Sequence, residues 1–135
     1  MKLIKVVAAL ITENNKILIG LRSTGRFVDF WEFPGGKVEN DELPEEALIR
    51  EIHEEFNLML KVRDFAFNVI HEYDDFVLSM DCFWCTAEDL SCLKMNDHSQ
   101  ILWYDPKINN DYRWLPADVK VVEKLREITE ITPSI

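Results

Sequence analysis

The sequence predicts a single α/β domain in which a mixed β-sheet lies between two helices. Strand-like apolar segments occupy the first twenty residues and residues 60–86, a helical pattern follows Pro44, and a second helical pattern starts at Pro116. Interspersed segments of these two kinds are typical of helices packed on the faces of a sheet, an α/β/α sandwich. The length of 135 residues fits one domain, 1–135.

The charge of the chain restricts its partners. With 15 basic and 25 acidic residues, the net charge is −10, so we expect binding to neither duplex nucleic acid nor an anionic membrane. A small anionic substrate is compatible with this charge if a divalent cation accompanies it. The sequence has no apolar run long enough to span a membrane and no signal-peptide cleavage pattern, so we expect a cytoplasmic protein, either monomer or homodimer.

The first half of the chain predicts a hairpin followed by a loop and a helix. Residues 3–12 and 16–21 read as two strands around a polar turn. The segment WEFPGGKVENDEL, residues 31–43, contains one proline and two glycines and cannot hold regular structure for long. Pro44 suits the first turn of a helix. The residues expected to face the core from this helix are Leu48, Ile52 and Phe56.

The second half predicts further strands and a closing helix. Residues 60–69 change the parity of their apolar positions near Arg63, which indicates either a bulge or two short strands. Residues 94–100 are polar and are expected to form a linker, whereas residues 101–104 resemble a strand. The closing helix is expected over residues 116–131, with three residues facing inward: Val122, Leu125 and Ile128.

Two of the three cysteines form a C-x-x-C pattern inside the predicted strand at 75–86. Because side chains alternate along a strand, Cys82 and Cys85 should point to opposite faces. This spacing disfavours a shared metal or redox site.

The stretch REIHEEFN, residues 50–57, crowds three glutamates onto one face of the predicted helix. On a helical wheel Glu51, Glu54 and Glu55 fall within about 100° of arc. Like charges at this spacing repel one another. One interpretation is an exposed acidic face, and the other is a cluster of hard oxygen ligands for Mg²⁺ or Mn²⁺, which would remove the repulsion.

The residues around this stretch resemble the Nudix hydrolase signature, G-x5-E-x7-R-E-U-x-E-E-x-G-U. The chain matches it from Gly36 onward except at Asn57, which replaces the last glycine and is compatible with a left-handed residue at the end of the helix. The resemblance implies metal-dependent hydrolysis of a nucleoside diphosphate linked to another moiety. It implies metal ligation by Glu51, Glu54, Glu55 and the Gly35 carbonyl, supported by Glu42 and Arg50.

Further site residues follow from stretches outside the signature. Asp97, which precedes His98, matches an acidic position that would supply a metal ligand or base, although both residues could simply belong to a loop. Asp118 matches a position that reads the edge of the base, and the alternative is a cap of the last helix. The other candidate substrate-binding residues are Arg22, which could also be a surface arginine, Phe33 and Lys37.

These stretches are most similar to the MutT-like subgroup, which hydrolyses nucleoside triphosphates to monophosphate and pyrophosphate. The resemblance implies an 8-oxo-dGTP or a CTP/dCTP type of substrate. Two alternatives stay open: another Nudix activity, on ADP-ribose, NADH or a dinucleoside polyphosphate, and a non-catalytic nucleotide-binding domain. The intact set of three glutamates argues against the non-catalytic alternative.

Overall fold

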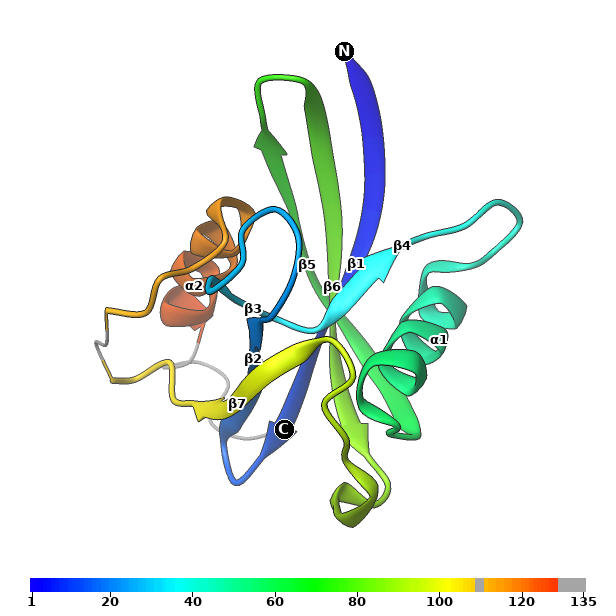
Figure 1. Ribbon diagram of the computed structural model, residues 1–135, viewed down its shortest axis with the longest axis vertical. Coiled ribbons are helices and arrows are strands. Elements are labelled where there is room, and N and C mark those ends of the chain that lie inside the picture. The colour runs from blue at the N-terminus through cyan, green and yellow to red at the C-terminus, as the bar shows by residue number, and fades with distance from the viewer. Residues whose placement is uncertain (109–110, 129–135) are drawn as a thin grey trace.

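The computed structural model describes residues 1–108 and 111–128 of the chain. It is an α/β sandwich, as expected, with a mixed sheet between helices α1 and α2 (Figure 1). The strands are β1 (Lys2–Glu13), β2 (Lys16–Arg22), β3 (Trp31–Glu32), β4 (Gly35–Lys37), β5 (Leu60–Glu72), β6 (Phe76–Ala87) and β7 (His98–Tyr104). The helices are α1 (Pro44–Phe56), the short 3₁₀ helix η1 (Leu90–Cys92) and α2 (Pro116–Ile128).

Strand β1 lies at the centre of the sheet and has different neighbours along its length. The strand order is β3-β2-β1-β6-β5, with β7 paired to β2 and β4 paired to β1. β1 runs parallel to β6 over most of its length and antiparallel to the other two partners, β4 and β2. Because β4 pairs with β1 only from Val6 to Ala8, the glycine segment is held beside the middle of the sheet.

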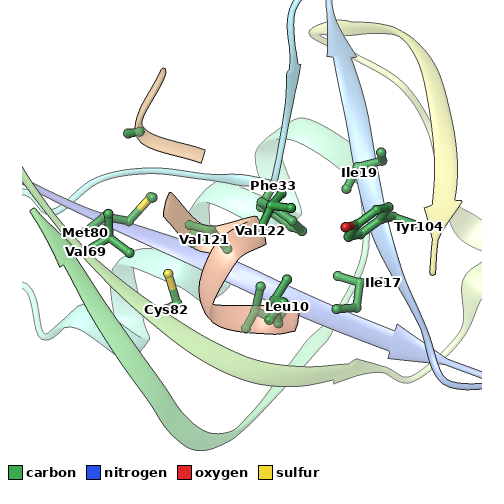
Figure 2. Packing of buried hydrophobic residues seen from close by; sticks show 13 residues of the cluster. Leu10, Ile17, Ile19, Phe33, Val69, Met80, Cys82, Tyr104, Val121 and Val122 are labelled. Carbon is green, nitrogen blue, oxygen red and sulfur yellow. The ribbon is translucent and has the colours of Figure 1, made fainter. Parts of the chain in front are cut away.

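Each helix covers one face of the sheet with its own hydrophobic core. The predicted inward residues of α1 are fully buried, and on the other face Val122 and Leu125 are buried while Ile128 packs against the same core. Figure 2 shows this second core, in which α2 packs on side chains from β1, β2, β5 and β6. The periodicity of the sequence therefore predicted both helix faces correctly. The expected end of α2, at 129–131, lies outside the described residues.

The cysteine prediction is confirmed. Cys82 belongs to the core under α2 and Cys85 to the core under α1, so the two thiols lie on opposite faces of β6. Residues 60–72 form one strand, β5, whose pairing with β6 is irregular between Val62 and Phe67. The change of parity near Arg63 therefore marks a bulge and not two strands.

The expected linker at 94–100 was partly wrong. β7 begins at His98, and its first residues pair with the end of β2. The polar composition of this segment misled the prediction because Ser99 and Gln100 are exposed while His98 is buried. Among the helices of the described residues, none is long and apolar enough to cross a bilayer.

Helix α1 ends at Asn57, where the backbone is left-handed with φ 55° and ψ 36°. The Asn57 backbone N–H donates to the His53 carbonyl at 3.0 Å, which closes the helix. Its side-chain Nδ2 donates to the Cys92 carbonyl at 3.1 Å and so joins the helix end to η1. The expectation of a left-handed residue is confirmed, and the side chain has an additional contact that the signature does not indicate.

We predict that Asn57→Gly changes the free energy of unfolding by less than about 1 kcal/mol, because easier left-handed geometry offsets the lost hydrogen bond. Asn57→Ala loses the hydrogen bond without this compensation and should cost about 1 to 2 kcal/mol. Urea unfolding of the three proteins measures both differences. A glycine variant that loses as much stability as the alanine variant would show that the side-chain contact dominates and contradict the prediction.

Candidate functional site

A cleft of about 400 Å³ opens between β4, the β2–β3 loop, the start of α2 and the end of the β5–β6 hairpin. It brings together residues that are far apart in the sequence. The lining includes seven of the predicted site residues: Arg22, Phe33, Gly35, Lys37, Glu55, Asp97 and Asp118. The remaining ones lie on α1 and on the loop that precedes it.

Arg50 joins that loop to α1. Its Nε donates to Glu42 Oε2 at 2.7 Å and its Nη2 donates to Glu42 Oε1 at 3.0 Å, a bidentate pair. Its Nη1 donates to Glu51 Oε1 at 2.9 Å, and Nη2 also reaches the Lys37 carbonyl at 3.1 Å. One guanidinium therefore sets the position of the loop and of the first signature glutamate on the helix.

The same contacts fix the charge of Glu42. The hydrogen bond from Arg50, together with one from the Glu39 backbone N–H, lowers the pKa of Glu42 to about 2. The carboxylate is therefore ionised throughout the neutral range, and its pairing with Arg50 is maintained there.

Two glycines make room for the site. A Cβ at Gly35 would collide with the backbone of Val7 and Ala8 on β1, so only glycine allows β4 to pair this closely. A Cβ at Gly36 would collide with the carboxyl group of Glu51. The first glycine of the signature is thus required because a signature carboxylate packs directly against its backbone.

Glu55 is the most buried of the three helix glutamates, with only 9% of its surface exposed. Burial, together with the nearby carboxylates of Glu32, Glu51 and Asp97, raises its pKa to about 9. The Glu54 side chain differs, since it is 59% exposed and lies 3.6 Å from Arg50. The site therefore contains one buried carboxyl group, Glu55, surrounded by less buried carboxylates that repel it.

Glu32 and His98 form a pair that no pattern in the sequence indicated. Glu32 Oε2 lies 2.8 Å from His98 Nε2, and Glu32 Oε1 accepts from Arg22 Nη1 at 3.1 Å. The His98 ring stacks on Phe56 at 4.8 Å between centroids and lies so close to Gly20 that a Cβ there would collide with it. Ligand atoms of Glu32, Glu55 and His98 lie within 4.8 Å of one another.

Asp97 is held from the other side of the cleft. Both the backbone N–H and the hydroxyl of Ser23 donate to the Asp97 carbonyl, at 3.3 Å and 2.8 Å. These bonds connect the β2–β3 loop to the start of β7. The sequence gives no signal for them, because residues 23 and 97 are brought together only by the pairing of β2 with β7.

Asp118 is 3% exposed and lies in the first turn of α2. Burial, and then the charge of Glu32, raise its pKa well above the ordinary value of an aspartate, and the Phe33 backbone N–H donates to it. The helix begins at Pro116, so of the two alternatives for Asp118 the N-cap is wrong. Phe33 is also 3% exposed, and its ring stacks on Trp114 at 5.2 Å.

Comparisons with known proteins agree with this geometry. Residues 6–124 match the family model of the NUDIX domain. The CTP pyrophosphohydrolase of Escherichia coli is 30% identical over 99% of both chains, and the 8-oxo-dGTP diphosphatase of Haemophilus influenzae is 29% identical over 92% of both. An ADP-ribose pyrophosphatase of Methanocaldococcus jannaschii is 44% identical, but over only 42% of this chain and 34% of its own.

Solved structures resemble the whole fold. The solution structure of the E. coli ORF135 protein has a TM-score of 0.82 and 30% identity, and covers 100% of this chain and 96% of its own. The crystal structure of the MutT protein from Methanosarcina mazei has a TM-score of 0.81 and 26% identity, and covers 93% of this chain and 94% of its own. The chain therefore belongs to the Nudix family, as a hydrolase of the MutT type.

We predict that Gly36→Ala destabilises the fold by about 1 to 3 kcal/mol, because the new methyl group displaces the Glu51 carboxyl group. The same change should cost much less in a Glu51→Ala background, where the displaced group is missing. Urea unfolding of the two single variants and the double variant measures this coupling. Additive effects would show that the methyl group meets an obstacle other than Glu51.

Proposed function

We propose that this enzyme hydrolyses a nucleoside or deoxynucleoside triphosphate to the monophosphate and pyrophosphate. The observation that carries the proposal is that one cleft joins the buried Glu55 and the carboxylates around it to Arg22 and Asp118. Such an arrangement suits a substrate with a phosphate chain at one end and a base at the other. The full-length similarity to enzymes named CTP pyrophosphohydrolase and 8-oxo-dGTP diphosphatase supports this substrate class.

The residues of the site fit one or more divalent cations, Mg²⁺ or Mn²⁺. The raised pKa of Glu55 reflects several carboxylates that converge on buried space, and a cation would compensate their repulsion. Carboxylate and carbonyl oxygens are ligands that both ions accept. We assign this role to Glu51, Glu54, Glu55, Asp97 and the Gly35 carbonyl. Bound there, the ions would neutralise the phosphate chain and make a water molecule more acidic.

The protein's own side chains would position the metal ligands and the substrate and would deprotonate the attacking water. Arg50 holds Glu51 in place, and Glu54 is exposed enough to accept the proton of the attacking water. We assign Arg22 and Lys37, both in the cleft lining, to substrate binding. Asp118 would read the base edge, and its raised pKa means that a protonated carboxyl can donate as well as accept a hydrogen bond. Phe33 lines the same cleft beside Asp118.

A nucleotide panel with Mg²⁺ or Mn²⁺ and product identification tests the proposal. Triphosphates should yield monophosphate and pyrophosphate. The second candidate, an ADP-ribose type of activity, is favoured by the partial match to an ADP-ribose pyrophosphatase and would yield AMP and ribose phosphate. Nucleotide binding without turnover of any compound would contradict both.

We predict that Glu54→Gln lowers kcat by several orders of magnitude, because the variant loses both a metal ligand and a proton acceptor. The melting temperature should change little, since the Glu54 side chain is 59% exposed. Glu45→Gln is the matched control, because Glu45 is an exposed glutamate on the same helix. A Glu54→Gln enzyme with near-normal kcat would overturn the assignment.

We further predict that Mg²⁺ or Mn²⁺ raises the melting temperature, because the ions bind the folded state selectively. Glu55→Gln should abolish most of this increase. Without metal, the variant should be at least as stable as the parent, since it removes a carboxylate from a repelling cluster. Thermal melts with and without metal measure both effects. An equal increase in the variant would exclude Glu55 as a ligand.

A further inference from the structure

The mouth of the cleft carries an aromatic patch from two separate elements, Phe27 and Phe30 of the β2–β3 loop and Tyr73 and Phe76 of the β5–β6 hairpin. Phe27 contacts Phe30 edge to face at 5.4 Å and Tyr73 at 6.1 Å, and Tyr73 stacks on Phe76 at 4.8 Å. Three of the four line the cleft, Phe30 being the exception. All four are only partly buried, so aromatic surface is available to a ligand there.

The β2–β3 loop presents this patch through an unusual backbone. Gly25, Phe27 and Asp29 all have positive φ, at 74°, 66° and 64°. A bulky residue such as phenylalanine rarely adopts this conformation, which persists only when the surroundings enforce it. Two backbone hydrogen bonds between Arg22 and the far end of the loop hold this conformation. The Asp29 N–H donates to the Arg22 carbonyl, and the Arg22 N–H donates to the Phe30 carbonyl.

Arg26, between two of these residues, lies over the aromatic patch. Its guanidinium carbon is 4.9 Å from the Phe27 ring centroid and 5.8 Å from the Tyr73 centroid. Its ion pair with Asp75 is long, at 3.9 Å, and both side chains are more than half exposed. Arg22, in contrast, is bound to Glu32 at 3.1 Å. Arg26 is therefore a cation of the cleft lining that can turn toward a ligand at small cost.

The two ends of the cleft differ in chemistry. The signature end has carboxylates and glycines, which suit metal-bound phosphates, while the mouth has aromatic faces and a planar cation. Aromatic faces attract a nucleobase but offer no donors to a phosphate group. A guanidinium can stack on a base as it stacks here on Phe27 and Tyr73.

We propose that Arg26 and Phe27, with Tyr73, bind the nucleobase of the substrate by its face, and that Arg26 covers the bound base as a stacked cation. This inference rests on the proposed function, because it assumes a nucleotide in the cleft. It adds recognition of the base face to the edge contact assigned to Asp118. Stacking accepts any base, so the patch contributes affinity while the choice of base is made elsewhere.

The test compares a non-hydrolysable α,β-methylene nucleoside triphosphate with inorganic tripolyphosphate by calorimetry in the presence of Mg²⁺. Arg26→Ala should weaken binding of the nucleotide about 3- to 30-fold, the range that one stacked cation supplies. It should leave tripolyphosphate affinity within about twofold. Arg26→Lys keeps the charge without the plane and should recover only part of the loss. Arg63→Ala removes an exposed arginine of β5 outside the cleft and should change nothing.

The outcomes separate this inference from the proposed function. Unchanged nucleotide affinity in Arg26→Ala overturns the base-stacking role. It does not contradict the proposed function. An equal loss for nucleotide and tripolyphosphate overturns it too, because Arg26 would then contact phosphate. A parent protein that binds neither compound contradicts the proposed function itself, and with it this inference.

Discussion

The bidentate pair between Arg50 and Glu42 is the interaction on which the site depends. The loop between β4 and α1 has little regular structure of its own, and its position relative to the helix must be fixed by side chains. Arg50 does this through two bonds to Glu42 and one to the Lys37 carbonyl, while a fourth orients Glu51. Because guanidinium and carboxylate are both planar, the pair fixes orientation as well as distance.

This arrangement keeps repelling groups close together. Glu51 packs against Gly36 and is hydrogen-bonded by Arg50, so it cannot move away from the buried Glu55. The electrostatic cost appears in the raised pKa of Glu55. Proteins retain such groups at functional sites, where a ligand supplies the missing compensation. The acidic face of α1 is thus only partly a solvated surface, since Glu54 is exposed but Glu55 is not.

The sequence predicted what depends on local spacing. The periods of helices and strands identified the inward residues of α1 and α2 and the opposite faces of Cys82 and Cys85. They also indicated the bulge in β5, because a change of parity is visible in sequence. The signature spacing placed Arg50 correctly beside its carboxylates, since Glu51 is its neighbour on the helix and Glu42 its partner from the loop.

Contacts that depend on strand register could not be predicted in this way. His98 looked like part of a polar linker, and its burial follows from pairing with β2 and from the missing side chain at Gly20. Glu32 lies in a strand of only two residues, too short to show alternation, yet it contacts Arg22 and His98. The start of α2 at Pro116 was predicted correctly, and it places Asp118 inside the first turn, which excludes the alternative of an N-cap at Asp118.

Glu32 shows how the fold couples the two ends of the cleft. Its charge raises the pKa of both Glu55 and Asp118, so it influences the carboxylates at the phosphate end and the polar group at the base end. Arg22 and His98 hold it in place from β2 and β7. A cation bound at Glu55 would offset part of the negative field that Asp118 also experiences. Under the proposed function, metal binding at Glu55 and the protonation of Asp118 would therefore be linked through the charge of Glu32.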